Sequence, residues 1–416
     1  MTTINRRSFL AAGGAATLTI ATGLGTGAFA APGVPLDGDV LVSLHLSGGA
    51  DGLSLTPPLR DPAYYDLRPN IAIPAPGEAN GALPLQANGT VSFSFGFDGA
   101  FGLHPAARAI HDGLWADGKL AIVPGAGFRG ATASHFTATR NHNRGSLSLL
   151  TGGGWLGRLS NGQGGPGPLP LVDNGGGSTS GGLGRIRAIP SLDQFRGGVF
   201  RSDWRDALNA SYAGADAVAG SGRFLLGVAD RLGSLEGGIR DGYPDTGWGR
   251  HFSELGSVLK ADPTLGVRAA SLRLGRWDHH ENLGVPGNTD AAFHTHVRQM
   301  SDALQAFADD TNGLDGIVVV ITTEFGRTTN ENGNQGTDHG QAYTMMVAGG
   351  AIKGGVYGDD FADSLALPSG RRRGSVPIMT DFRKPIAEVI RKRVKLADTS
   401  AAFPDFVQEG PDLGIA

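Results

Sequence analysis

Short apolar runs rich in β-branched residues recur along the chain and predict the strands of a sheet. They lie at residues 39–46, 120–123, 267–274, 317–322 and 343–348. The first run alternates between apolar and polar positions, and the run at 317–322 is continuously apolar apart from its last residue. Both patterns are typical of strands, the second of a strand buried on both faces.

Longer segments with helical spacing lie between these runs. They are residues 105–116, 203–255 with glycine breaks, 291–309, and 381–396, which has a basic face. Alternating strands and helices predict an α/β fold with a mostly parallel sheet sandwiched by helices. Residues 145–184 are rich in Gly, Pro and Ser, which indicates a long loop or surface excursion, extending to about residue 190, within a single domain at 31–416.

Composition narrows the chemistry. With 416 residues, 40% of them hydrophobic, the chain can bury a sizeable core. It has no cysteine, which excludes disulfides, thiolate catalysis and cysteine–zinc sites. Any metal must be held by oxygen and imidazole nitrogen, which favours zinc, magnesium, manganese or calcium. A net charge of −4 gives no indication of a nucleic-acid partner.

The first 30 residues have the pattern of an export signal. Asn5-Arg6-Arg7-Ser8-Phe9-Leu10 precedes a weakly apolar run that ends at Ala28-Phe29-Ala30. Paired arginines before such a run predict a twin-arginine signal, with a Sec signal or an uncleaved anchor as the alternatives. No later run reaches the roughly 18 apolar residues that span a bilayer. We therefore expect the twin-arginine translocase as a partner, a periplasmic or extracellular location, and no membrane span in the mature protein.

Several candidate metal ligands follow predicted strands. In an open α/β sheet, ligands gather at the carboxyl ends of strands, where Asp51, Glu324 and His339 are expected. Asp278 and His280 follow the run at 267–274. Residues i and i+2 of an extended segment point to one face, which favours His280 over His279 as a ligand. The alternative for this pair is an ordinary surface loop.

Other polar residues are candidates for catalysis. Ser134 follows the run at 120–123, and a nearby cation would lower the pKa of its hydroxyl and make it a nucleophile; the alternative is a helix N-cap. Arg327 could hold an anion through its planar guanidinium. His104 before Pro105 is expected to cap a helix. His294 and His296 are expected to be solvated.

Three carboxylates in one cleft would need compensation. If Asp51, Asp278 and Glu324 converge, each charge raises the pKa of the others. A divalent cation is the simplest way to relieve that repulsion. The sequence therefore favours a metal site at this edge of the sheet.

Motifs spread along the chain resemble one family. They are Leu46-Ser-Gly-Gly-Ala-Asp-Gly-Leu53, Tyr65-x-x-Arg-Pro69, Leu103-His-Pro105, Ser134-His-Phe136, Gly154-Trp-Leu-Gly-Arg158, Trp277-Asp-x-His280, Glu324-Phe-Gly-Arg-Thr328, Asp338-His-Gly340 and Thr380-Asp-Phe-Arg383. In these motifs the chain is similar to the bacterial proteins classed as domain of unknown function 1501, which are often exported by the twin-arginine route. That family resembles the alkaline phosphatase and sulfatase superfamily.

The resemblance implies an alkaline-phosphatase-like fold and one or two divalent ions. It implies one ion on Asp51 and Glu324 and another on Asp278, His280 and His339. Ser134 would stand at the position of the nucleophile. The function implied is a metal-dependent hydrolase of small anionic phosphate or sulfate esters.

The chain also departs from the superfamily pattern. Glu324-Phe325 replaces the usual Asp-His, which predicts a weak or absent second ion. Ser375-Val-Pro-Ile-Met379 lacks the arginine of the sulfatase motif, which disfavours a formylglycine sulfatase. The alternative function is therefore a non-catalytic, metal-stabilised binding or envelope protein with a degenerate site.

Overall fold

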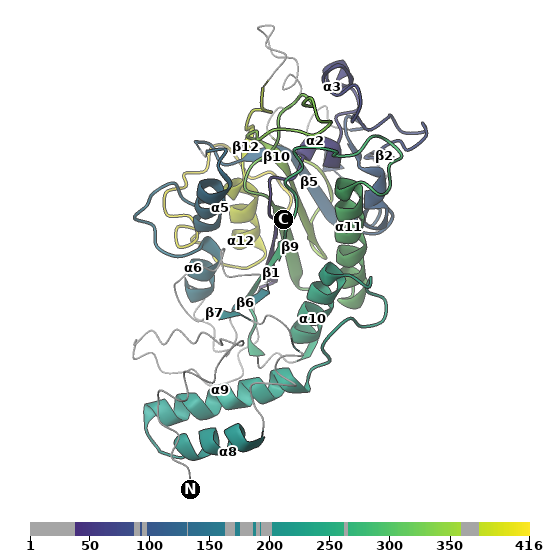
Figure 1. The fold of residues 1–416 in the computed structure, drawn as a ribbon. Helices are drawn as coiled ribbons and strands as arrows, with labels where there is room; N and C mark the ends of the chain where they lie inside the picture. The colour runs from purple at the N-terminus through teal and green to yellow at the C-terminus, as the bar shows by residue number, and fades with distance from the viewer. Residues whose placement is uncertain are drawn as a thin grey trace.

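A mixed sheet with helices on both faces forms the centre of the molecule (Figure 1). The structure is a computed structural model that describes residues 38–86, 92–93, 98–130, 132–162, 171–174, 186–188, 192, 202–261, 265–358 and 374–416. The predicted signal segment at 1–30 lies outside the described residues. The predicted α/β class with a mostly parallel sheet is confirmed.

The predicted strands form the middle of this sheet. In spatial order the strands are β3 (Ser92–Phe93), β11 (Gly355–Val356), β5 (Leu120–Gly127), β10 (Tyr343–Gly349), β9 (Ile317–Thr322), β1 (Val40–Leu46), β8 (Ala269–Leu274), β6 (Leu171–Asn174) and β7 (Ile186–Ala188). A further short strand, β12 (Thr380–Asp381), pairs with β5. Among the described pairs of this sheet, only those of β10 with β5 and β9 are antiparallel. A separate antiparallel pair joins β2 (Leu83–Pro84) to β4 (Gly102–Leu103).

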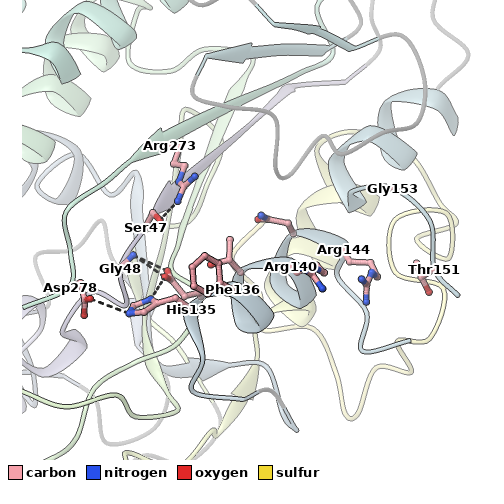
Figure 2. Close-up of a pocket in the computed structure, with 13 residues that line it drawn as sticks. Ser47, Gly48, His135, Phe136, Arg140, Arg144, Thr151, Gly153, Arg273 and Asp278 are labelled. Carbon is pink, nitrogen blue, oxygen red and sulfur yellow. Dashed lines mark hydrogen bonds and ion pairs between the residues drawn. The ribbon is translucent and has the colours of Figure 1, made fainter. Parts of the chain in front are cut away.

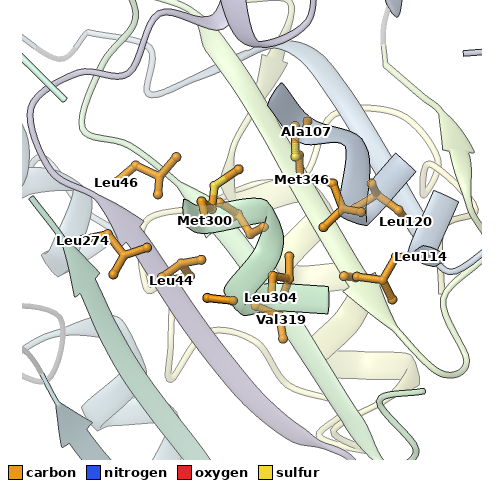
Figure 3. Packing of buried hydrophobic residues seen from close by; sticks show 14 of the residues in the cluster. Leu44, Leu46, Ala107, Leu114, Leu120, Leu274, Met300, Leu304, Val319 and Met346 are labelled. Carbon is orange, nitrogen blue, oxygen red and sulfur yellow. The ribbon is translucent and has the colours of Figure 1, made fainter. Parts of the chain in front are cut away.

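The two faces of the sheet bury different clusters of side chains, because successive residues of a strand point to opposite sides. In β1, Val42 and Leu44 belong to one cluster and Leu41 to the other. The first cluster packs against α10 (Gly247–Ala261) and α11 (Ala292–Asp310), as Figure 3 shows for Met300 of α11. The second packs against α6 (Trp155–Gly162) and α12 (Arg383–Lys392). Continuous apolar strands are therefore covered on both faces, as expected for a largely parallel sheet.

The helices follow the predicted segments closely. The run at 105–116 is helical as η1 (Pro105–Ala107), α4 (Arg108–Ile110) and η2 (His111–Trp115). The segment at 203–255 contains α8 (Ser202–Ser211), α9 (Ala217–Ser234) and most of α10. Outside the Gly-rich excursion, three helices were not predicted: α2 (Gly52–Leu55), α3 (Pro62–Leu67) and α5 (His135–Arg144). Within the described ranges, every helix is too short or too polar to cross a bilayer.

The Gly-rich excursion contains more regular structure than the sequence predicts. Its first part forms α6, in which Trp155, Leu156 and Leu159 are buried against the second cluster. Strand β6 also lies in it and pairs with β8 in parallel. The prediction of a loop was wrong for these two elements, because glycine-rich composition masked a few well-spaced apolar residues. Residues 163–170 and 175–185 lie outside the described part.

Candidate metal centre

One edge of the sheet brings the candidate residues together. Strands β8, β1 and β9 are parallel neighbours, so their carboxyl ends lie side by side. The segments that follow them contribute Asp278, Gly48 and Glu324 respectively. Strand β10 runs the opposite way, so its amino end, preceded by His339, lies at this same edge. The structure therefore places Asp278 and Glu324 after the carboxyl ends of β8 and β9, and His339 before the amino end of β10, at one edge of the sheet.

Four side chains form a group that could hold a metal ion. The ligand atoms of His135, Asp278, His280 and His339 all lie within 4.8 Å of one another. Asp278 is central to the group. One of its oxygens, Oδ2, lies 3.3 Å from Nε2 of His135, while Oδ1 lies 3.1 Å from Nε2 of His280 and 3.5 Å from Nε2 of His339. Three members of this group were predicted, and His135 was not.

Each histidine points Nδ1 away from the group, toward an oxygen that can only accept. Nδ1 of His135 donates to Glu324 Oε1 at 2.9 Å, and Nδ1 of His339 donates to the carbonyl of Ala133 at 2.7 Å. His280 makes a longer contact of 3.4 Å with Asp338 Oδ1. Since the acceptors at His135 and His339 carry no hydrogen, these two contacts favour the tautomer with the proton on Nδ1. The Nε2 lone pairs are then free to bind a cation.

The Nε2 atoms fit such a cation. Nε2 of His280 lies 2.9 Å from Nε2 of His339, so the two nitrogen atoms point into the same space. Nε2 of His135 is buried and has no hydrogen-bond partner among the described residues. Burial, reinforced by the charge of Arg327, lowers the pKa of His339 and keeps this ring neutral at pH 7. A tetrahedral ion with bonds of about 2.0–2.1 Å needs ligand atoms about 3.3 Å apart, close to the spacings here.

Glu324 lies behind the group and supports it. The carboxylate is buried and accepts hydrogen bonds from the backbone N–H of Gly48, from Thr323 and from His135. Nε2 of the buried His45, at the end of β1, lies 3.4 Å away. Burial alone would raise the pKa of Glu324, but its interactions with His45 and His135 outweigh burial and hold that pKa well below its usual value. His45 was not predicted, although a histidine in a buried strand is a recognisable signal.

Arg327 joins the segments that meet at this edge of the sheet through its hydrogen bonds. It is buried and donates to the carbonyls of Gly48, Gly49 and Thr337, and to Asp278 Oδ1 at 2.6 Å. Burial would raise the pKa of Asp278, but the hydrogen bond and charge of Arg327 outweigh it and lower that pKa. The predicted role of Arg327 as an anion holder therefore has little room, because its donors are already used by the protein.

Gly48, in the turn that follows β1 at this edge of the sheet, could not be replaced by a residue with a side chain. Gly48 has a φ of 128°, and a Cβ there would lie 2.5 Å from the backbone nitrogen of Asp278. The absence of a side chain lets the Gly48 N–H reach Glu324 while its carbonyl accepts from Arg327. Gly48 thus allows the segment after β1 to lie directly against the segment after β8.

Asp51 lies in a different network from the four-residue group. It is buried, caps α2 by accepting from the N–H of Ser54, and forms a two-pronged ion pair with Arg68 at 2.8 and 3.0 Å. Burial would raise the pKa of Asp51, and Arg68 reverses that effect and lowers it. Asp51 and Glu324, predicted as ligands of one ion, are therefore committed to separate partners. The guanidinium of Arg68, and not a metal ion, compensates the charge of Asp51.

Ser134 occupies the N-cap position of α5 but forms no capping hydrogen bond. It is exposed and lies between Ala133 and His135, which both contact the group. The aromatic side chain of Phe325 packs beneath His135 and His339, with ring centroids 4.8 and 4.6 Å apart. Phe325 thus forms an apolar support at the position where a further metal ligand would be expected from the superfamily pattern.

Three other histidines that the sequence analysis considered lie outside the group. His279 is buried beside Phe293 and His296, so it points away from the group as predicted. His104 accepts from the N–H of Ala106 and caps η1, also as predicted. The prediction of a solvated His296 was wrong, because its ring packs against Trp277, which belongs to the first hydrophobic cluster, and against His279.

The comparisons with known proteins bear on this edge. Residues 264–366 match the family described as protein of unknown function (DUF1501). The DUF1501 match includes Asp278, His280 and His339, together with Glu324 and Arg327. It supports the resemblance to the DUF1501 family over this part of the chain. A comparison with curated proteins finds no match.

Proposed function

We propose that this protein is an exported, metal-dependent hydrolase of phosphate or sulfate esters, on the pattern of the alkaline phosphatase and sulfatase superfamily. One observation carries the proposal: the four-residue group opens onto a cavity. The side chains of Asp278 and His280 are 44% exposed, and His135 and Asp278 line a cavity of about 690 Å³. A metal placed only to stabilise the fold needs no such access.

The ligand set favours zinc. Three imidazoles and one carboxylate are donors that zinc accepts in tetrahedral geometry. Magnesium and calcium prefer oxygen ligands and are disfavoured by three nitrogen donors. The hydrogen bonds at Nδ1 of His135 and His339 match the outer contacts that usually orient metal-bound histidines. A bound ion would polarise the ester and stabilise negative charge during its cleavage.

The protein would supply the nucleophile from α5. Ser134 is exposed, forms no capping hydrogen bond, and directly precedes His135. Its hydroxyl oxygen would attack phosphorus or sulfur and displace the alcohol, and water would then release the inorganic anion. Phe325 packs against the imidazoles of His135 and His339 on the side of the sheet, which leaves the exposed side of the group for an ester.

The second candidate function is a metal-stabilised binding or envelope protein without catalysis. Four protein ligands favour it, because structural zinc sites are usually closed by four side chains, whereas catalytic sites keep one position open. The two candidates therefore agree on the metal and differ on whether Asp278 yields its position to a substrate.

A metal and activity assay separates the two functions. The full chain would be purified, loaded separately with zinc, manganese, magnesium or calcium, and tested against p-nitrophenyl phosphate and p-nitrophenyl sulfate. We expect at least one zinc ion per chain and turnover of one ester class. Ser134→Ala should retain the metal and lose turnover, while His339→Ala should lose both.

Two results would contradict the hydrolase. A full complement of zinc with no turnover of either ester would favour the second candidate. Less than one ion of every metal per chain would refute both candidates.

A further inference from the structure

The cavity beside the metal group has one wall made by a single helix (Figure 2). Its floor contains Gly48, His135, Asp278 and Glu324. The wall consists of α5 side chains spaced along one face, which are Phe136, Thr139, Arg140, Asn143 and Arg144. Residues three and four apart on a helix are neighbours, so this face presents a continuous surface to the cavity.

The cavity carries positive charge that no carboxylate neutralises. Within the described chain, Arg140 forms no hydrogen bond or ion pair, Arg144 donates to the carbonyl of Ser148, and Arg273 donates to Ser47 Oγ. None of these three arginines pairs with an acidic side chain that the structure describes. The two acids that line the cavity are already engaged, Asp278 by Arg327 and Glu324 by His135. An anionic ligand is the partner that this wall lacks.

Arg140 and Arg144 lie progressively farther along α5 from His135, which belongs to the metal group. A helix rises about 1.5 Å per residue, so Arg140 and Arg144 lie about 7.5 and 13.5 Å along α5 from His135. A ligand that extends from the metal group along α5 would place a second anionic group beside these arginines.

Two further side chains that line the cavity indicate the chemistry of the part of the ligand that joins the anionic groups. Asn143 is 3% exposed, lines the cavity, and has no partner for Oδ1 among the described residues. An unpaired buried acceptor is unfavourable, so it favours a ligand with a hydrogen-bond donor, such as a hydroxyl group. Phe136 is 86% exposed at the same wall and offers a flat apolar surface one helical turn from Arg140. Hydroxyl groups on a ring with apolar faces are characteristic of a sugar.

We propose that this cavity binds a sugar ester with at least two phosphate or sulfate groups, one at the metal group and one on the arginines of α5. The inference rests on the proposed function for the identity of the reacting group. Binding to the arginines and Asn143 needs no catalysis.

The test compares ligands with one and two anionic groups. Isothermal titration calorimetry would measure glucose 1-phosphate against glucose 1,6-bisphosphate, and a monosulfated against a trisulfated disaccharide, on metal-free and zinc-loaded protein at fixed ionic strength. In at least one pair, we expect the multiply charged ligand to bind about tenfold tighter or more, as for added hydrogen bonds to a charged group. The pair that shows this preference identifies phosphate or sulfate.

The variant Arg140→Gln with Arg144→Gln should abolish the preference. The matched control is Arg108→Gln with Arg231→Gln, which removes the same charge from exposed positions on α4 and α9 outside the cavity. We expect the control to keep the preference, since only nonspecific attraction is reduced.

The outcomes distinguish this inference from the proposed function. Arginine-dependent preference in metal-free protein supports the ligand site even if no ester is cleaved. Equal binding of singly and multiply charged ligands in both pairs, or an equal loss in the control, overturns the ligand site even if simple esters are hydrolysed.

Discussion

Nδ1 of His135 donates to a carboxylate oxygen of Glu324 across 2.9 Å, and the two residues come from elements 189 positions apart in the sequence. This hydrogen bond fixes the ring so that Nε2 faces Asp278. Removing the charge of Glu324 should weaken metal binding without removing a ligand. We expect Glu324→Gln to lower zinc affinity about 10- to 100-fold, the usual effect of losing such an outer contact.

Competition with a zinc-binding dye measures this affinity. Glu236→Gln is the control, because Glu236 is exposed and outside the group. Zinc affinity in Glu324→Gln equal to that of the unmodified protein would show that Glu324 does not orient His135.

His135 separates the observed group from the ligand set predicted by sequence. We expect His135→Ala to bind less than 0.1 zinc ions per chain at about micromolar free zinc, because it removes a direct ligand. Elemental analysis after gel filtration gives the stoichiometry. Circular dichroism checks the fold, since His135 is only partly buried. Full zinc occupancy in a folded His135→Ala protein would remove this residue from the site.

Asp51 should behave in the opposite way. Asp51→Asn leaves the guanidinium of the buried Arg68 without its carboxylate. Breaking one side of a buried ion pair costs about 3–5 kcal/mol in the free energy of unfolding. Zinc stoichiometry in the folded fraction should stay unchanged. Denaturant titration tests the first expectation, and loss of zinc from the folded protein would restore Asp51 as a ligand.

We expect His104 to make the free energy of unfolding depend on pH in the acid range. Burial, with a smaller effect from the charge of His294, lowers the pKa of His104 to about 3, whereas an unfolded histidine titrates near pH 6.5. Below pH 6.5 the unfolded chain therefore binds a proton that the folded chain does not. The stabilising contribution is complete above pH 6.5 and is lost as the pH falls toward 3, by about 2 kcal/mol between pH 7 and pH 5.

His104→Asn isolates this contribution. The amide oxygen can still cap η1 through the N–H of Ala106 but does not titrate. We expect the drop in unfolding free energy between pH 7 and pH 5, measured with a chelator present, to be about 2 kcal/mol smaller in the variant. The same drop in both proteins would show that His104 titrates normally in the fold.

The strands that build the site were predictable because they are long and buried on both faces. Strands β1, β8 and β9 are rich in apolar residues and almost entirely buried, and packing on both sides leaves such runs little alternative. The antiparallel direction of β10 was not predicted, and the structure shows no helix between β9 and β10 that would allow a parallel crossover. Two-residue strands such as β11 carry no pattern of their own.

The site was predictable only in part because spacing does not identify a partner. Asp278, His280 and His339 follow or precede strands at one edge, so topology alone brings them together. Asp51 also follows a strand that ends at this edge, but its partner is Arg68, at the carboxyl end of α3. The sequence pattern cannot show whether a carboxylate will pair with a guanidinium or bind a metal ion. His135 was missed because its neighbour Ser134 offered the more familiar chemistry.

The reversed direction of β10 has a consequence for the order of folding. Glu324 and His339 flank the single connection between adjacent antiparallel strands, so closing that hairpin brings them near each other early. The contact between Gly48 and Glu324 spans 276 positions, and β1 must insert between β8 and β9 before it forms. An ion that requires all four ligands therefore binds only a chain whose first strand is in place. Zinc occupancy would act as a marker that folding is complete.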